Sequence, residues 1–116
     1  MTPKEQLQYD IFLLFKYGKI KEAETMMVDN NLDYLEVSPT DKWNWLHQLL
    51  MDFSEKKPSL ESIKFLIDKR VPVNAQDSYG KTPLLYAMRS QNTDATILLL
   101  ENGAEPNIHD KKMNIP

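Results

Sequence analysis

The chain has 116 residues, of which 41% are hydrophobic and 27% are charged, a composition that suits one folded domain with a single core. It contains no cysteine, which excludes disulfides, thiolate nucleophiles and metal sites built on cysteine, and which fits a reducing, cytoplasmic compartment. Its 14 basic and 17 acidic residues give a net charge of −3 with no basic stripe, and no segment approaches the roughly 18 unbroken apolar residues that span a membrane, so neither nucleic acid nor a membrane is an expected partner.

Helical signals begin with the first residues of the chain. Thr2 can cap a first helix, with Pro3 at its first position and Glu5 completing a capping box. Apolar residues then recur at helical spacing until Gly18, a suitable helix stop, and they comprise Leu7, Ile11, Phe12, Leu14, Phe15 and Tyr17. A second, shorter helix is predicted over residues 20–28, with Met26 and Met27 in the core.

Four further helices are predicted in two pairs. The third follows residues 39–41, and its expected apolar face consists of Trp45, Leu46, Leu49, Leu50 and Phe53. After a polar loop over 54–58, Ser59 caps the fourth, whose inward residues are Ile63, Leu66 and Ile67. The fifth spans 84–88 after Thr82 and Pro83, and the sixth runs from a Thr93 cap to Asn102 and Gly103. No segment alternates with a period of two for long enough to form a strand, so the chain is predicted to be all-α.

The sequence also repeats itself with a period of 33 residues. Asn74-Ala75-Gln76-Asp77 returns as Asn107-Ile108-His109-Asp110, and Phe65-Leu66-Ile67 returns as Leu98-Leu99-Leu100. A fainter copy places Met26-Met27-Val28 in the same position. Helices repeated at this spacing predict a stack of helix pairs.

The second half of the chain resembles one full ankyrin repeat. The matching segments are Asp77-Ser78-Tyr79-Gly80-Lys81-Thr82-Pro83-Leu84-Leu85-Tyr86-Ala87 and Leu98-Leu99-Leu100-Glu101-Asn102-Gly103-Ala104-Glu105-Pro106-Asn107. They combine a turn glycine, a Thr-Pro-Leu helix start, an alanine and a Gly-Ala turn at fixed offsets. The resemblance implies an ankyrin-type solenoid of antiparallel helix pairs that binds a protein partner without catalysis.

The resemblance divides residues 1–116, taken as a single ankyrin-repeat domain, into four parts. Residues 1–38 are expected to be an N-terminal capping repeat, and 39–76 a degenerate repeat with a loop about five residues longer and Arg70 in place of the turn glycine. Residues 77–109 form the clear repeat, and 110–116 begin a fourth that stops at its proline. The open apolar end allows three interpretations: a fragment, a frayed terminus, or a face covered by a partner or by a second copy in a homodimer.

The resemblance also implies a binding surface, because partners of ankyrin repeats dock on the concave side formed by the turn tips and the first helix of each pair. Matched position by position, this surface holds Asp41, Trp43, Gln48, Met51 and Asp52 in the degenerate repeat, and Ser78, Tyr79, Lys81, Tyr86, Arg89 and Ser90 in the clear repeat. Trp, Tyr and Arg concentrate binding energy at interfaces, so Trp43, Tyr79, Tyr86 and Arg89 are the expected anchors. The alternative for Trp43 is that it packs back onto its own repeat.

No catalytic, metal-binding or cofactor-binding pattern is evident. His47 falls at the histidine of the family's Thr-Pro-Leu-His motif, where the ring binds turn backbone, and Trp45, at the helix start, is expected to pack between repeats. His109 falls in a turn tip, and neither histidine has a second ligand at metal spacing. We therefore expect no enzyme, metal or cofactor, with a small hydrolase as a remote alternative. Similar small bacterial ankyrin proteins include immunity proteins that block a toxin, and a modestly acidic chain suits a basic toxin or enzyme as partner.

Overall fold

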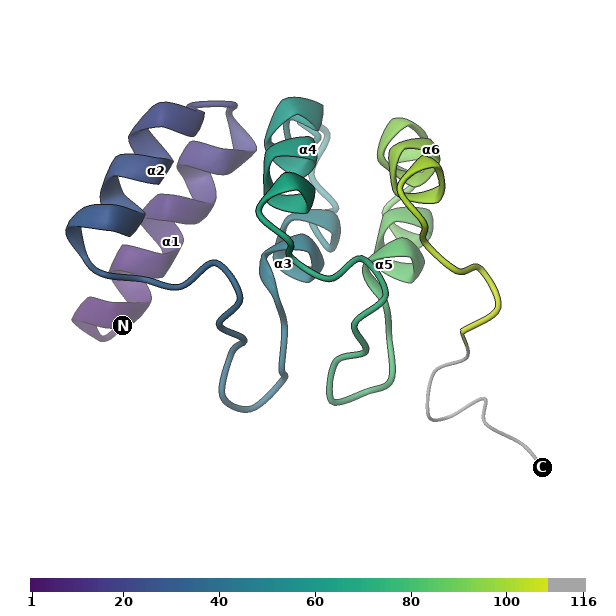
Figure 1. Ribbon diagram of the computed structural model, residues 1–116, viewed down its shortest axis with the longest axis horizontal. Helices are drawn as coiled ribbons and strands as arrows, with labels where there is room; N and C mark the ends of the chain where they lie inside the picture. The colour runs from purple at the N-terminus through teal and green to yellow at the C-terminus, as the bar shows by residue number, and fades with distance from the viewer. Residues whose placement is uncertain (109–116) are drawn as a thin grey trace.

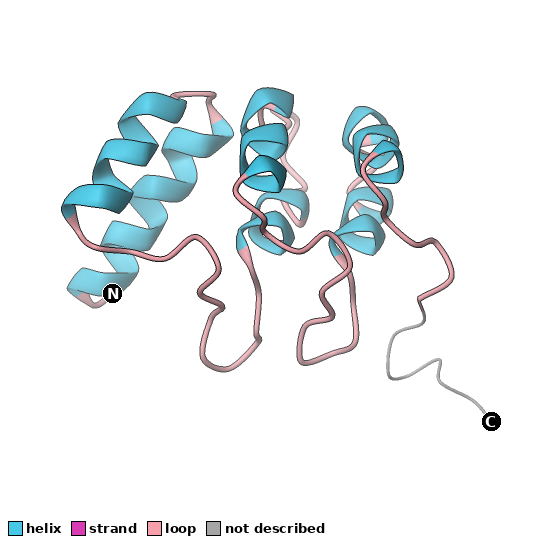
Figure 2. Cartoon of the chain, in the orientation of Figure 1, coloured by secondary structure: helices cyan, strands magenta, loops and turns pink. Residues whose placement is uncertain are grey.

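The computed structural model describes residues 1–108, and within this range the chain forms six helices and no strand (Figure 2). These are α1 (Pro3–Lys16), α2 (Ile20–Asp29), α3 (Trp45–Leu50), α4 (Leu60–Asp68), α5 (Pro83–Arg89) and α6 (Thr93–Glu101). The predicted all-α fold is confirmed. The predictions for His109 and for residues 110–116 lie outside the described residues.

The helices form three pairs that stand side by side in a row (Figure 1). Within the pairs, α1 packs on α2, α3 on α4, and α5 on α6. Between the pairs, α3 packs against both α1 and α5, and α4 packs against α6. The helices α1, α3 and α5 therefore form one layer of a solenoid, and α2, α4 and α6 form the other. The connections after α2 and α4 extend together beyond the same end of the helices (Figure 1).

One continuous core links the three pairs. Each helix contributes apolar side chains, and the fully buried members include Ile11, Phe15, Ala23, Met27, Leu46, Leu49, Leu50, Ile63, Leu66, Ala87, Ala95 and Leu99. Trp45 is also buried, and its ring meets that of Phe15 edge-on at a centroid distance of 5.5 Å. The expected packing of Trp45 between repeats is confirmed.

Side-chain caps begin the helices where local signals predicted them. Thr2 Oγ1 accepts the Glu5 backbone N–H at 3.1 Å, and Glu5 Oε1 accepts the Thr2 N–H at 3.0 Å, which completes the predicted capping box. Ser59 and Thr82 cap α4 and α5. The expected Thr93 cap is wrong: Thr93 is the first residue of α6, and the Asn92 side chain accepts the Ala95 N–H at 3.2 Å.

Two aromatic residues assigned to helical apolar faces lie at the surface instead. Phe53 is 67% exposed, because α3 ends at Leu50 and Phe53 falls in the connection to α4. Tyr17 caps the end of α1 and is 53% exposed.

Several helices are followed by a residue in the left-handed region of the backbone. Gly18 after α1 and Gly103 after α6 have φ values of 77° and 94°. Arg70 after α4 has φ 71° and Gln91 after α5 has φ 58°, so both hold a conformation that glycine adopts more easily. Arg70 therefore occupies the turn position predicted for it.

Candidate functional site

Hydrogen bonds join the turn tips of neighbouring repeats. The Ser78 backbone N–H donates to the Asp41 carbonyl at 2.8 Å, and the Ser78 hydroxyl donates to the Thr40 carbonyl at 2.7 Å. The Tyr79 hydroxyl donates to the Asp41 carboxylate. These contacts hold the two tips in one arrangement, so the surface that they form is preorganised.

The Asp77 side chain also links the same two repeats. Its Oδ1 accepts the backbone N–H groups of Tyr79 and Lys81, each at 2.9 Å. Its Oδ2 accepts the indole N–H of Trp43 at 3.0 Å and the hydroxyl of Tyr86. Trp43 is half-buried and bound to the next repeat, so it neither stands free nor packs only on its own repeat.

This cluster shifts the titration of its members. Burial of Asp77 opposes its ionisation, but the hydrogen bonds from Tyr86, Lys81, Tyr79 and Trp43 together lower the pKa of its carboxyl. Burial and the hydrogen bond to Asp77 raise the pKa of Tyr86 to about 12. At neutral pH the Asp77 carboxyl is therefore ionised, and all four of its hydrogen-bond partners are donors.

His47 supports the same turn from inside α3. Its Nδ1 accepts the Asn44 backbone N–H at 3.0 Å, and its Nε2 lies 3.0 Å from the Lys81 carbonyl, which requires the neutral tautomer with the proton on Nε2. Burial, partly offset by the hydrogen bond to Lys81, lowers the pKa of this imidazole. The predicted binding of the His47 ring to turn backbone is confirmed.

Two residues expected on the partner surface are engaged within the protein. Ser90 is only 4% exposed, and its hydroxyl donates to the Leu50 carbonyl at 2.9 Å, so its assignment to an exposed surface is wrong. The position lies where α5 meets α3 and is covered by that contact. Asp52 is half-buried and pairs with Lys16 at 2.9 Å.

The remaining predicted residues fall into two groups. Asp41, Trp43, Gln48 and Met51 line a groove, here called the α1 groove, which is formed by α1, α3 and the segment 32–41. Ser78, Tyr79, Lys81, Tyr86 and Arg89 lie in the next repeat and do not line it. Arg89 is exposed, and the Lys81 ammonium lies 5.7 Å from the centre of the Tyr79 ring.

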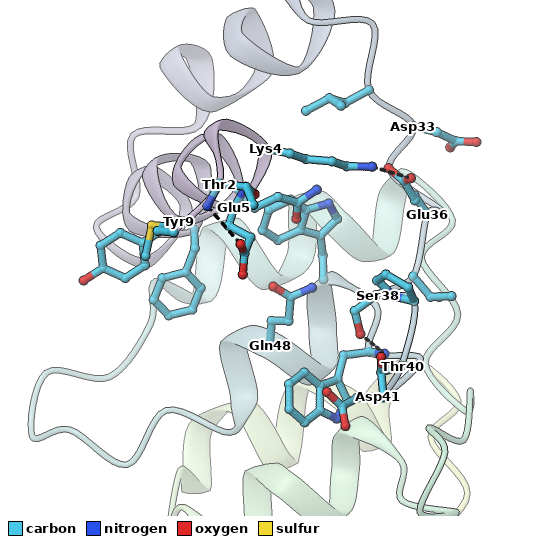
Figure 3. A pocket seen from close by; sticks show the side chains of 18 of the residues that line it. Thr2, Lys4, Glu5, Tyr9, Asp33, Glu36, Ser38, Thr40, Asp41 and Gln48 are labelled. Atoms are coloured by element: carbon cyan, nitrogen blue, oxygen red, sulfur yellow. Dashed lines mark hydrogen bonds and ion pairs between the residues drawn. The ribbon is translucent and has the colours of Figure 1, made fainter.

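The α1 groove has a volume of about 880 Å³ and a mainly apolar lining (Figure 3). Its apolar residues are Met1, Tyr9, Phe12, Met27, Leu32, Val37, Pro39, Trp43, Trp45 and Met51, and its charged residues are Lys4, Glu5, Asp33, Glu36 and Asp41. The sequence reasoning missed the contributions of α1 and of residues 32–39. The pair Tyr9 and Phe12, three positions apart on one side of α1, was the available signal.

Within residues 1–108 no three His, Asp or Glu side chains are grouped as a metal site would require. No helix in the same range combines the length and the apolar character needed to cross a membrane.

Paired helices in two layers, joined by projecting turns, define the chain as a repeat solenoid. The chain belongs to the ankyrin repeat family, because residues 13–110 match the model for ankyrin repeats in three copies. The family is generally non-catalytic, and its repeats are modules of protein–protein interaction.

Curated proteins similar to this chain come from distant sources. A putative ankyrin repeat protein, L371, of Acanthamoeba polyphaga mimivirus is 30% identical over 105 residues, which cover 90% of this chain and 13% of that protein. A putative ankyrin repeat protein of Rickettsia bellii is 38% identical over 48 residues, 41% of this chain and 29% of that protein. The human neurogenic locus notch homolog protein 2 is 45% identical over 47 residues, 40% of this chain and 2% of that protein. The matched part of this chain thus spans less than a third of each relative.

Proposed function

We propose that this chain binds a protein partner on its concave side, over the α1 groove and the adjoining turn tips. The observation that carries the proposal is the groove itself, a mainly apolar hollow of about 880 Å³ lined by residues from α1, α3 and the turn segment between α2 and α3. Exposed apolar surface that is gathered in a hollow is typical of interaction sites. We place the binding in the cytoplasm, because a cysteine-free chain suits a reducing compartment.

The adjoining aromatic side chains support the same surface. The polar ends of Trp43 and Tyr86 are bound to Asp77, and that of Tyr79 is bound to Asp41. Side chains that are already held in place lose little conformational entropy when a partner docks. Arg89, exposed at the end of α5, adds a cation to this part of the surface.

Self-association is a second candidate, and it rests on exposed apolar side chains of the last helix pair. Met88, Ile97 and Leu100 are each close to half exposed, and Ile97 also lines a hollow between α6 and α4. An inhibitor of a basic toxin would be one form of partner binding, distinguished only by the identity and charge of the partner. The experiment described next separates partner binding from self-association.

The test is selection of random displayed peptides on the immobilised chain, followed by affinity measurements on single variants. Met51→Glu and Arg89→Glu place an acidic group on the concave side. Ile97→Glu on α6 and Lys64→Glu on α4 make the matched changes in the other helix layer. We expect Met51→Glu or Arg89→Glu, or both, to lose binding, and Ile97→Glu and Lys64→Glu to keep it. Circular dichroism should show that all four variants are folded. Absence of any enriched peptide, or equal loss in the outer variants, would overturn the proposal. A concentration-dependent mass that Ile97→Glu abolishes would favour self-association instead.

A further inference from the structure

Within the proposed binding function, on which this inference rests, we propose that the α1 groove takes an extended peptide segment of the partner, with a bulky apolar side chain next to a lysine or arginine. Three independent features of the groove point to this occupant: an open aromatic wall, an amide without a hydrogen-bond partner, and a rim with an excess of carboxylates.

The aromatic wall leaves room for a side chain from another molecule. Tyr9 stacks on Phe12 with ring centroids 6.2 Å apart, yet Tyr9 remains 49% exposed on the groove side of α1. Val37 lines the groove from the opposite segment and is 40% exposed. Because their apolar surfaces face a common hollow and water, a bulky apolar side chain placed between them would bury surface from both walls.

Gln48 provides a side-chain amide that can hydrogen-bond to the backbone of the bound peptide. It extends from α3 into the groove (Figure 3), and its side-chain amide makes no hydrogen bond to any residue of the described chain. A carboxamide presents one acceptor oxygen and two N–H donors, which complement the N–H and C=O of a peptide group. Extended segments leave these backbone groups available, whereas a helix uses them internally.

The charges of the rim select the partner's side chain. Four carboxylates line the groove, from Glu5, Asp33, Glu36 and Asp41, against the single lysine Lys4. Lys4 lies 3.4 Å from Glu36, which leaves the other three without a cation from the groove lining. The hydrogen bonds with Thr2 lower the pKa of Glu5, so this carboxyl is ionised at neutral pH. Such exposed charges select a basic segment more than they strengthen its binding.

The helix α1 supplies a matched pair of variants. Tyr9 lies in α1 and Tyr17 caps the end of the same helix, with similar exposure, 49% and 53%, but only Tyr9 lines the groove. For peptides enriched on the wild-type chain, Tyr9→Ala should raise Kd roughly tenfold or more, and Tyr17→Ala should leave it within about twofold. Gln48→Met keeps the shape of the side chain but removes its hydrogen bonds, and should also raise Kd.

The charge requirement is tested with Asp33→Asn, which removes a groove carboxylate that has no cation from the groove lining and keeps an oxygen for the Leu35 N–H. The control is Asp29→Asn, the same change at an exposed residue that does not line the groove. We expect the enriched peptides to carry Lys or Arg beside Trp, Phe or Leu, and only Asp33→Asn to weaken the dependence of Kd on salt. Enriched peptides without basic residues would overturn the inference. If Arg89→Glu weakens binding while Tyr9→Ala and Gln48→Met do not, the groove inference fails and the proposed function stands. If no concave variant changes Kd, both fail.

Discussion

Asp77 fixes two aromatic side chains from different repeats with one carboxylate. Trp43 precedes it by 34 residues and Tyr86 follows it by nine, yet both donate to the same oxygen. The second oxygen accepts two N–H groups of its own turn. A buried carboxylate that faces four donors has no neutral equivalent of the same shape, because a neutral side chain must present either a proton or fewer lone pairs.

Replacing Asp77 tests this cluster directly. Asp77→Asn brings an NH₂ group against donors, and we expect a loss of about 2–3 kcal/mol in the free energy of unfolding at pH 7. Because the folded-state pKa of Asp77 is lowered, its contribution is present above the unfolded value near 4 and is lost as the pH falls further. Urea denaturation should therefore show the wild type and the variant converging below about pH 4. The exposed Asp29→Asn serves as control, and an equal effect there would contradict the assignment.

His47 gives a second pH-dependent contribution at the scale of a residue. His47→Leu introduces an apolar side chain of similar size and leaves the Asn44 N–H and the Lys81 carbonyl unpaired, so we expect a loss of about 2 kcal/mol at pH 7. Burial lowers the pKa of the imidazole below its unfolded value near 6.5, so the stability it provides is lost as the pH falls through that range. Thermal melts should show the gap between the two proteins narrowing from about pH 7 to pH 5. A constant gap would mean that protonation of His47 is not linked to unfolding.

At the scale of the elements, the helix ends show where local rules suffice and where they do not. The starts of α1, α4 and α5 could be predicted because the capping side-chain oxygen and the backbone N–H that donates to it lie within three residues of each other. The end of α3 could not: the apolar pattern continues to Phe53, but the helix stops at Leu50 and a long connection follows. Likewise, the tie between Trp43 and Asp77 and the position of the α1 groove depend on contacts between repeats, which the spacing of residues within one repeat does not reveal.

The left-handed residue after α5 predicts a stabilising substitution. Gln91 has φ 58°, a region that costs an L-residue about 1–2 kcal/mol, and glycine removes this cost while losing about 0.5–1 kcal/mol to the entropy of the unfolded chain. Gln91→Gly should therefore raise the free energy of unfolding by up to about 1 kcal/mol, measured as a melting temperature a few degrees higher. Gln91→Ala relieves none of the strain and should give no such gain. A lower melting temperature for the glycine variant would show that the Gln91 side chain stabilises the turn.

At the scale of the whole molecule, contacts between the three helix pairs run from neighbour to neighbour. The middle pair, α3 and α4, packs against α1 on one side and against α5 and α6 on the other. In such an arrangement stability is close to a sum of the individual pairs and the interfaces between adjacent pairs. Cooperative unfolding of the described chain therefore depends on the middle pair.

Two fully buried leucines distinguish the middle of the row from its end. Leu49 lies on α3 and Leu99 on α6, and each truncation to alanine should cost about 2–5 kcal/mol. Leu49→Ala weakens the middle pair, which joins the first pair to the last. Hydrogen exchange along a urea titration should therefore show α1–α2 and α5–α6 opening at different denaturant concentrations. Leu99→Ala should lower protection first in α5 and α6 and leave the first two pairs together. Identical, uniform loss of protection in both variants would contradict a sum of neighbouring interfaces.

The ties between the turn tips have a mechanical consequence. Ser78 and Tyr79 hold Asp41 and Thr40 through three hydrogen bonds at one edge of the row, away from the helices. A pull along the row would load this edge and the interface between the middle and last pairs together. These two pairs would therefore resist bending that opens the turn-tip edge more than bending that closes it. The row of helix pairs would then be stiffer against bending in one direction than in the other.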